Sequence, residues 1–310
     1  MSGGRPPTRF VLGTVQLGMP YGKLRKFAFP SDDEAVALMR RAASLGITEF
    51  DTARNYGQSE MRLGDAFGPT HDAAHHIVTK LHPLQHVPLD APEWAVRAAV
   101  EASVFASCRA LRTRHLPVLL LHLVFARHAW NCAAWRRLLE MRDEGIIGKL
   151  GVSVVNPAEA IEFADDPDVK HMQVPINILD RRWRELGIAE KFAARPDITV
   201  HARSIFLQGV LLQDDPAGWP PRSGRQAAAI IAWLRDLTRE FGLSGVAQLA
   251  VNYLRSLGWI DGLVVGVEDE DQLAGNLRLF DTPLLREAQL ARIEATRPAI
   301  ENWLLDPGKW

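Results

Sequence analysis

Short apolar stretches rich in β-branched residues alternate along the chain with longer segments whose apolar residues recur every three or four positions. This alternation is typical of repeated βα units that build a parallel sheet. Eight strands are expected, at Phe10–Val15, Thr48–Ala53, His76–Leu81, Val118–Leu123, Lys149–Ser153, Gln173–Ile176, Thr199–Arg203 and Gly262–Val267. The amphipathic segments predict helices at Ala35–Leu45, Glu93–Leu111, Trp130–Arg142, Glu185–Ala194, Gln226–Phe241, Val246–Leu257 and Leu284–Trp303.

Residues at the ends of the expected helices support this division. Ser31 precedes Glu34 by three positions, which predicts a capping box at the start of a helix. Asn156 precedes Glu159 by three, with Pro157 at the first helical position, which predicts a second box. Glycines expected to end helices stand at Gly46, Gly145 and Gly242.

The chain length and the absence of linkers favour one large barrel. The 310 residues correspond to about two average domains, but a (β/α)₈ barrel of ~250 residues with extensions fits equally well. No Gly-, Ser- or Pro-rich linker divides the sequence, and no G-x-G-x-x-G follows the first strand as in a doubly wound sheet. We therefore expect residues 1–310 to form a single α/β domain, a (β/α)₈ TIM barrel with a C-terminal helical extension.

The composition is that of a globular protein without a nucleic-acid or membrane surface. Hydrophobic residues make up 47% and charged residues 24%, which argues against disorder. Lysine and arginine number 36 against 37 acidic residues, so no overall positive field attracts nucleic acid or an anionic membrane. The two cysteines lack metal-ligand spacing, and no signal peptide or long apolar run is recognisable. A soluble, cytoplasmic protein without a metal is expected, and its oligomeric state is left open.

Three polar side chains close otherwise apolar strands, and a fourth follows in the same loop as the first. Asp51, Lys80 and His122 end expected strands, and Tyr56 follows Asp51. A charge at the end of a buried strand is costly unless it is paired or used. Each residue alone also has a structural interpretation, as a helix cap, a snorkelling lysine, a hydrogen-bonded core histidine or a packed tyrosine.

Together these four residues have the parts of a proton-transfer site. A phenol has an ordinary pKa near ~10, and a neighbouring ammonium lowers that pKa by favouring the phenolate. Asp51 can hold Lys80 beside Tyr56, while His122 orients a substrate oxygen by donating a hydrogen bond. This combination suits carbonyl reduction, because the carbonyl oxygen gains negative charge as hydride reaches the carbon and needs a proton donor.

The segment F-D-T-A-R-N-Y-G-Q-S-E, Phe50–Glu60, resembles the Asp-Thr-Ala-x-x-Tyr-Gly-x-Ser-Glu signature of the aldo-keto reductase family. The resemblance continues in order through nearly the whole chain, at Leu12–Gly18, Val78–Leu81, Leu119–His122, Gly148–Ser153 and Val264–Asn276. It implies a (β/α)₈ barrel and a nicotinamide dinucleotide cofactor, NADP(H) or NAD(H), across the carboxyl mouth of that barrel. The catalytic tetrad that it implies is Asp51, Tyr56, Lys80 and His122.

The resemblance also implies residues that bind the cofactor. Ser153 and Gln173 match positions that hydrogen-bond the nicotinamide carboxamide, although Val154 replaces an asparagine that is frequent in the family. Arg203 stands where many members stack a tyrosine on the nicotinamide ring, and a guanidinium plane also stacks. The remaining implied positions are Gly13, Thr14, Asp51, Ser204, Gly266, Glu268, Gln272 and Asn276.

The chain departs most from the family at the adenosine end of the cofactor. Members that grip the 2′-phosphate of NADPH usually present lysine, serine and arginine after the eighth strand, where this chain has Glu268 and Asp269. Carboxylates repel a phosphate but accept hydrogen bonds from a free ribose diol, which favours NAD(H). Alternatively the two residues only cap the next expected helix, Glu270–Leu279, and family habit favours NADPH.

The function implied by the resemblance is reversible hydride transfer between the dinucleotide and a small aldehyde or ketone. The segments Ala202–Leu212 and Gln173–Arg182 resemble a bacterial branch associated with sugar metabolism, which makes a sugar-like carbonyl the expected substrate. A sugar dehydrogenase working in the oxidative direction is the nearer alternative, since the same tetrad serves both directions. A non-catalytic, redox-sensing binding module is a further alternative.

Other loop residues are weaker candidates for contact with the substrate. Arg54, Asn55, Phe125 and His128 follow strands, although exposed loop residues of these types are more often uninvolved. The tail Asn302–Trp310 either folds over the mouth, as tails do in the family that the chain resembles, or packs on the barrel exterior.

Overall fold

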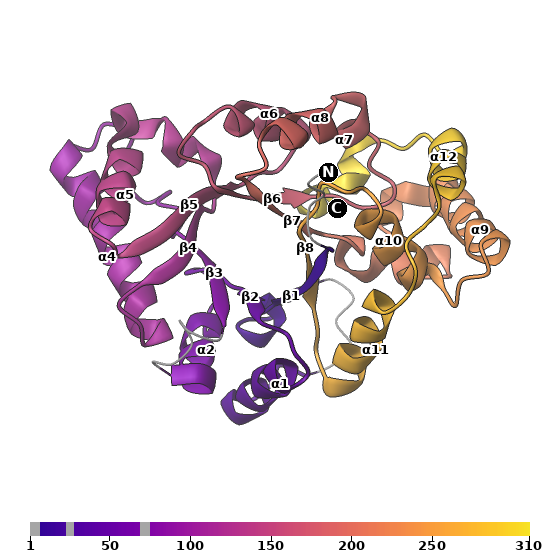
Figure 1. Ribbon diagram of the computed structural model, residues 1–310, viewed down its shortest axis with the longest axis horizontal. Coiled ribbons are helices and arrows are strands. Elements are labelled where there is room, and N and C mark those ends of the chain that lie inside the picture. Colours follow the sequence, from indigo (N-terminus) through magenta and orange to yellow (C-terminus); the bar gives the residue numbers. More distant parts are fainter. Residues whose placement is uncertain (1–6, 23–27, 69–74) are drawn as a thin grey trace, which may run out of the picture.

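Eight parallel strands close into a barrel in the computed structural model, which describes residues 7–22, 28–68 and 75–310 (Figure 1). Each strand pairs with its neighbours in chain order, and β1 pairs with β8 to close the barrel. The strands are β1 Arg9–Gly13, β2 Glu49–Asp51, β3 His76–Lys80, β4 Leu116–Leu121, β5 Ile147–Ser153, β6 His171–Pro175, β7 Thr199–Arg203 and β8 Gly262–Gly266. All eight predicted strands are confirmed, with ends within two residues of the expected ones.

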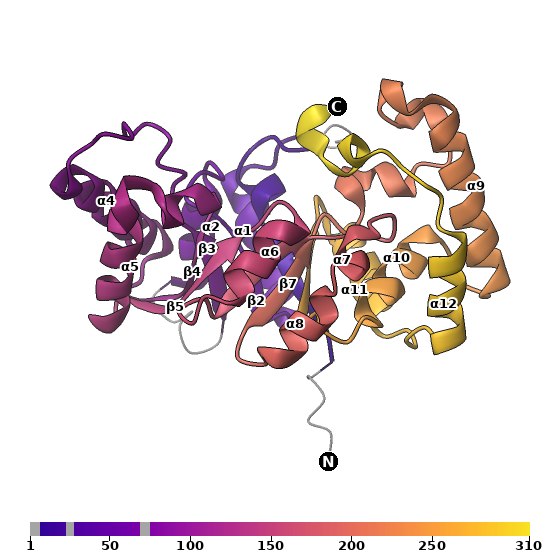
Figure 2. The same ribbon diagram turned by 90° about the horizontal axis from the view of Figure 1, so that it is seen from above.

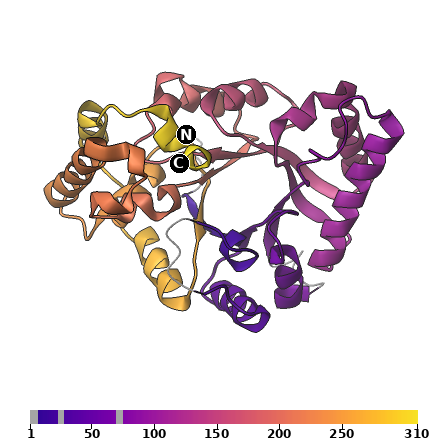
Figure 3. The same ribbon diagram turned by 180° about the vertical axis from the view of Figure 1, so that it is seen from behind.

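The helices lie outside the strands, and Figure 3 shows the same arrangement from behind. Their bounds are α1 Asp32–Ser44, α2 Ser59–Phe67, α4 Glu93–Leu111, α5 Ala133–Asp143, α6 Pro157–Ala164, α7 Arg182–Glu185, α8 Ile188–Ala194, α9 Gly224–Glu240, α10 Val246–Arg255, α11 Glu270–Phe280 and α12 Glu287–Thr296. Every predicted helix overlaps one of these, and α4 has the predicted bounds. The expected (β/α)₈ barrel is therefore confirmed.

The predicted helix boundaries are supported by side-chain caps. The Ser31 hydroxyl accepts a hydrogen bond from the Glu34 amide, and the Glu34 carboxylate accepts one from the Ser31 amide, which completes the capping box of α1. Asn156 caps α6 by accepting from the Glu159 amide at 3.0 Å, but the Glu159 carboxylate accepts from Val155, so the second box is not reciprocal. Positive φ angles directly after α1, α5 and α9 occur at Gly46, Gly145 and Gly242.

The sequence pattern does not predict α2, Ser59–Phe67, because a buried arginine interrupts its apolar face. Arg62 is only 2% exposed. Its guanidinium donates to the carbonyl oxygens of Leu17 and Pro30 at 2.6 and 3.0 Å and pairs with Asp32 at 2.7 Å. These partners come from the loop after β1 and from the start of α1, so tertiary contacts rather than periodicity stabilise this helix.

The helix of the C-terminal extension is shorter than the sequence pattern predicts. A helix is expected up to Trp303, but α12 ends at Thr296. Pro298 explains the difference, because a proline disfavours helical backbone in the residue before it. Arg297 accordingly has φ −55° and ψ 125°. The tail then continues in two 3₁₀ turns, Asn302–Leu305 and Pro307–Lys309.

The tail lies on the side of the barrel where the strands end (Figure 2). It contacts the segment that follows β7, since the Arg222 guanidinium lies 4.7 Å from the centre of the Trp303 ring. Gln226 of α9 also donates to the Ala299 carbonyl oxygen at 3.2 Å. Among the helices that the structure describes, none is long and apolar enough to cross a membrane.

The barrel interior is polar at both ends and apolar between them. Successive side chains of a strand point to opposite faces, so residues two apart share the interior. A small apolar cluster fills the middle, formed by Val78, Val118 and Leu120. At the amino end, the His171 and His201 rings lie 4.3 Å apart, and His201 Nε2 lies 3.1 Å from Glu49. Burial lowers the pKa of His171 well below its usual range, so this ring is neutral at neutral pH.

The contact between α2 and α4 requires glycine at position 64. A methyl group on Gly64 would lie 2.2 Å from the carbonyl oxygen of Ala110, so the helices would have to separate. We expect Gly64→Ala to lower the free energy of unfolding by roughly 1–3 kcal/mol, measured by urea denaturation. Gly275→Ala in α11 is the matched control, because its methyl group has no atom nearer than 3.9 Å. That control should raise the free energy of unfolding by up to ~1 kcal/mol; equal effects of the two substitutions would contradict the close packing.

Candidate active site

A cavity of about 640 Å³ opens at the carboxyl ends of the strands. Strand alternation explains its polar lining, because Asp51, Ser153, Gln173 and Arg203 lie two positions after Glu49, Gly151, His171 and His201 and so share the interior face with them. Of the residues predicted to form the site, those that line this mouth cavity are Gly13, Asp51, Tyr56, His122, Ser153, Gln173, Arg203, Ser204, Gly266, Glu268, Gln272 and Asn276. Lys80 lies directly beneath, bound to Asp51.

A buried ion pair joins the ends of β2 and β3. Lys80 Nζ lies 2.9 and 2.7 Å from the two carboxylate oxygens of Asp51 and 2.8 Å from the carbonyl oxygen of Thr52. The three donors of the ammonium therefore all have acceptors. Gln173 Nε2 donates to Asp51 Oδ2 at 2.6 Å from the opposite wall. This network holds the carboxylate and the ammonium in one arrangement beneath the cavity.

Tyr56 lies above this pair in the loop between β2 and α2. Lys80 Nζ is 4.9 Å from the centre of its ring. Burial raises the pKa of Tyr56 above its usual value, while the positive charges of Lys80 and Arg203 lower it. The net shift is upward because desolvation outweighs the ammonium, while the contribution of Lys80 itself has the predicted, lowering sign. The phenol consequently keeps its proton at neutral pH.

His122 faces Tyr56 from the end of β4. The two rings meet edge to face, with centres 5.7 Å apart and planes at 86°. Burial lowers the pKa of His122 to about 3, and the charges of Lys80 and Arg203 act in the same direction. At neutral pH the ring is therefore neutral, with one nitrogen able to donate and the other able to accept. His122 Nδ1 is buried and has no hydrogen-bond partner among the described residues.

Close backbone contacts hold the loop that carries Tyr56. A Cβ atom on Gly18 would lie 2.1 Å from the Tyr56 carbonyl oxygen, and Gly57 has φ +56°. The Gln58 amide donates to the Gly18 carbonyl oxygen at 2.9 Å. Two glycines thus let the loop after β1 cross the loop after β2, which sets the position of the tyrosine.

Thr14 supports the site from outside the cavity. The structure buries this residue completely, and its hydroxyl donates to the Asp51 carbonyl oxygen at 2.8 Å and lies 2.5 Å from the Ser59 hydroxyl. It is not among the residues that line the mouth cavity. Its hydroxyl thus joins the ends of β1 and β2 to α2, and contact of Thr14 with the cofactor stays a prediction.

The residues predicted to meet the nicotinamide end lie on adjacent strands. Ser153 and Gln173 are paired in register on β5 and β6. The Arg203 side chain donates to the Val154 carbonyl oxygen at 3.0 Å. Val154, which replaces the asparagine frequent in the family, therefore holds the Arg203 guanidinium through its backbone. Gly266 ends β8 directly against Gln16, since a Cβ there would lie 1.9 Å from Gln16 Oε1.

The two carboxylates after β8 have different surroundings. Asp269 caps α11 by accepting from the Gln272 amide at 2.7 Å and does not line the cavity, so the capping interpretation is correct for this residue. Glu268 lines the cavity with Gln272, whose side chain accepts from the Glu268 amide at 3.1 Å. Arg255 donates to the Leu279 and Thr282 carbonyl oxygens at the other end of α11.

Loops after β1 and β7 supply lining residues that the sequence pattern does not single out. Their position after strands is the sequence signal that points to them. Gln208 Nε2 donates to the Tyr21 hydroxyl at 3.3 Å, which joins the two loops. The others include Gln16, Phe206 and Gln213.

The weaker candidates for substrate contact lie elsewhere. Arg54 forms an ion pair with Glu60, which is buried and also accepts from the Thr79 hydroxyl at 2.7 Å. His128 pairs with Glu162 at 2.8 Å. The residues that line the mouth cavity include none of these candidates, namely Arg54, Asn55, Phe125, His128 and the tail Asn302–Trp310. Within residues 7–22, 28–68 and 75–310, no group of three or more histidine, cysteine or acidic side chains is placed to hold a metal ion.

Comparison with known proteins identifies relatives along the whole barrel. An uncharacterized oxidoreductase of Mycobacterium bovis is 26% identical over 307 residues, covering 94% of this chain and 90% of the relative. The solved structure of aldo-keto reductase AKR11C1 from Bacillus halodurans superposes with a TM-score of 0.72 at 19% identity, covering 95% of this chain and 94% of that one. The glycerol dehydrogenase AKR11B4 of Gluconobacter oxydans gives 0.70 at 22% identity, with 96% and 94% covered.

A family model settles the relationship that these comparisons suggest. The model of the aldo/keto reductase family matches residues 9–298, which include every strand of the barrel and the whole of the mouth cavity. The chain is therefore a member of the aldo/keto reductase family of oxidoreductases.

Proposed function

We propose that this oxidoreductase transfers hydride reversibly between a nicotinamide dinucleotide and the carbonyl carbon of a small aldehyde or ketone. The observation that carries the proposal is the convergence of a protonated phenol, a neutral imidazole and a buried ammonium–carboxylate pair on one cavity. The dinucleotide supplies the hydride when bound, and the protein supplies the proton.

Tyr56 is the proton donor in this proposal. Its raised pKa keeps the hydroxyl protonated until negative charge develops on the carbonyl oxygen. Lys80 then stabilises the phenolate through its positive charge, and Asp51 holds the ammonium in place. His122, neutral at working pH, donates a hydrogen bond that orients the carbonyl oxygen toward Tyr56.

The mouth cavity suits a dinucleotide. Gly13 and Gly266 leave the strand ends open on one side, and Ser153 and Gln173 offer hydrogen-bonding groups beside the tetrad. Glu268 is well placed to accept from the hydroxyls of the adenosine ribose, and its charge disfavours a 2′-phosphate. We therefore propose that NADH is accepted at least as well as NADPH.

The substrate side of the cavity favours a hydroxylated carbonyl compound. Side-chain amides both donate and accept hydrogen bonds, and Gln16, Gln208 and Gln213 all line the cavity with Tyr21. A small sugar or polyol offers matching groups. The oxidative direction is the second candidate, supported by the name of the glycerol dehydrogenase that shares the fold.

Turnover separates these functions from that of a redox-sensing binding module. A panel of aldehydes, ketones, aldoses and polyols, followed by the absorbance of the reduced dinucleotide, should show turnover in at least one direction. Binding of a dinucleotide without turnover of any compound in the panel would favour the binding module.

Replacement of Tyr56 by phenylalanine removes the proposed proton donor. We expect Tyr56→Phe to lower kcat by roughly 10²–10⁴-fold while dinucleotide binding is retained. Tyr253→Phe is the control, because the Tyr253 hydroxyl is bonded to Glu294 and Arg297 far from the cavity, so this variant should lose stability and not kcat. Steady-state kinetics of both variants measure these effects. A kcat of Tyr56→Phe close to that of the wild type would disprove the assignment of Tyr56 as the proton donor.

Removal of the Lys80 charge should be visible in the titration of Tyr56. Lys80→Met leaves burial unopposed by the ammonium, so the pKa of Tyr56 should rise further and activity should fall across the neutral range. The phenolate absorbance, measured against a Tyr56→Phe background, reports this pKa. An unchanged pKa together with an unchanged pH–rate profile would make Lys80 a structural residue only.

The charge of Glu268 should determine the preference between the two dinucleotides. We expect Glu268→Gln to improve the Kd for NADPH relative to NADH several-fold, because removing the carboxylate relieves a repulsion of ~1 kcal/mol. Glu270→Gln is the matched control, since Glu270 lies at the same end of α11 but does not line the cavity. Isothermal titration of the three proteins decides the matter; a wild-type Kd for NADPH more than tenfold below that for NADH would refute the proposal.

A further inference from the structure

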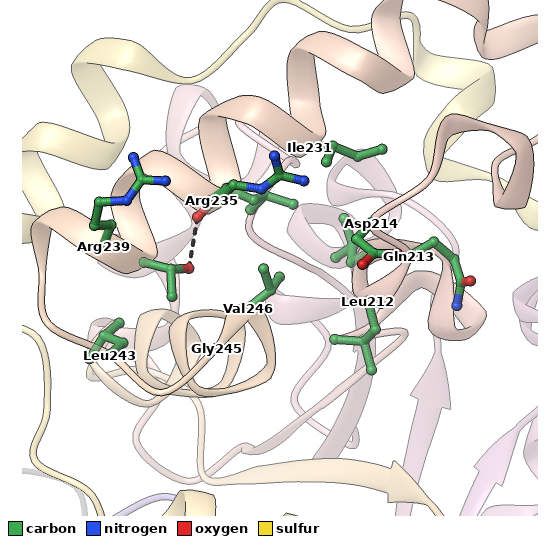
Figure 4. Close-up of a pocket in the computed structure, with 12 residues that line it drawn as sticks. Leu212, Gln213, Asp214, Ile231, Arg235, Arg239, Leu243, Gly245 and Val246 are labelled. Carbon is green, nitrogen blue, oxygen red and sulfur yellow. Dashed lines mark hydrogen bonds between the residues drawn. The ribbon is translucent and has the colours of Figure 1, made fainter.

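A second cavity, of about 410 Å³, lies beside the mouth (Figure 4). In Figure 4 the α9 side chains Ile231, Arg235 and Arg239 form its upper edge. Residues 243–246 form the lower edge and residues 212–214 the right end. Its volume falls within the range of ~300–1,000 Å³ that small-molecule sites occupy. None of its lining residues belongs to the tetrad or to the positions implied for the dinucleotide.

The walls of this α9 groove are mainly apolar. Leu211, Ile231 and Leu234 form buried parts of the wall, at 1%, 8% and 1% exposure, while Leu212 is 43% exposed. Leu243 and Val246 add apolar surface from the start of α10. Covering such a surface with the hydrocarbon part of a ligand is favourable, because it removes apolar area from water.

The rim of the α9 groove has excess positive charge. Arg235 and Arg239 lie one turn apart on α9, and Asp214 is the only acidic residue of the lining. Arg239 lies 3.3 Å from Asp236, with both side chains exposed. The exposed side chain of Arg235 makes no hydrogen bond or ion pair with any other described residue, so its guanidinium is available to a ligand.

We propose that the α9 groove binds a small amphipathic carboxylate. The apolar body lies against Leu211, Leu234 and Val246, and the carboxylate accepts hydrogen bonds from Arg235, with Arg239 adding favourable charge. Such binding requires neither dinucleotide nor turnover, so it stands apart from the proposed reductase activity. Because Leu212 and Gln213 line both cavities, a bound ligand would contact the segment that borders the mouth.

Gly245 offers a way to change the groove without damaging the fold. It precedes α10 with extended backbone, φ 171° and ψ 175°, and α10 has no side-chain cap. A Cβ atom there has no neighbour within 4 Å. Gly245→Asp supplies a favoured capping residue and places a negative charge in the groove, while Gly245→Ser caps without that charge.

Isothermal titration of octanoate into the 310-residue chain tests the proposal. We expect one saturable site, with weaker binding of octan-1-ol, which has the same body without the charge. Arg235→Ala should weaken octanoate binding about fivefold, as expected for an exposed ion pair. Arg225→Ala, which removes a charge from α9 outside the groove, should leave the affinity unchanged.

The two Gly245 variants separate the effect of the added charge from the effect of the added helix cap. Gly245→Asp should weaken octanoate binding at least tenfold, and Gly245→Ser should retain it, with neither variant melting below wild type. Three results would overturn the proposal: equal affinities for octanoate and octan-1-ol, full affinity in Arg235→Ala, or displacement of octanoate by saturating NADH. The last result would show that the groove is an extension of the mouth cavity.

Discussion

The buried ion pair between Lys80 and Asp51 is the interaction on which the mouth of the barrel depends. Lys80 is fully buried, and leaving one partner of such a pair alone in a protein interior costs ~3–5 kcal/mol. Its ammonium binds the end of β2, and Asp51 in turn accepts from Gln173 of β6. One cation therefore links three strands, β2, β3 and β6, directly beneath Tyr56.

Burial keeps both polar rings above this pair, Tyr56 and His122, uncharged at neutral pH. The raised pKa of Tyr56 and the lowered pKa of His122 have the same main cause, desolvation of the charged form. Both rings consequently carry a hydrogen that can be donated at neutral pH. An oxygen atom that enters the cavity meets two neutral donors and a fixed positive charge behind one of them.

The sequence predicted the barrel, and the grouping of Asp51, Tyr56, Lys80 and His122 at its mouth, because both depend on local signals. The catalytic role of these four residues stays a prediction. Strand alternation and strand-end polarity are readable along the chain, and the Phe50–Glu60 motif is contiguous. The sign of the pKa shift at Tyr56 was not readable, because it depends on burial by loops distant in sequence. For the same reason the pattern missed α2, whose buried Arg62 is satisfied by residues 17 and 30, and the contact between Tyr21 and Gln208.

Glu268 and Asp269 have different structural roles, and this difference decides which substitutions the loop after β8 accepts. The side chain of Asp269 caps the first turn of α11, whereas Glu268 lines the cavity and contacts the same turn through its backbone amide, which donates to the Gln272 side chain. Any residue other than proline supplies this amide, so the side chain at position 268 can change while the hydrogen bond to Gln272 is kept. Under the role proposed for Glu268, a single substitution at this position changes the dinucleotide preference and leaves the Asp269 cap of α11 in place.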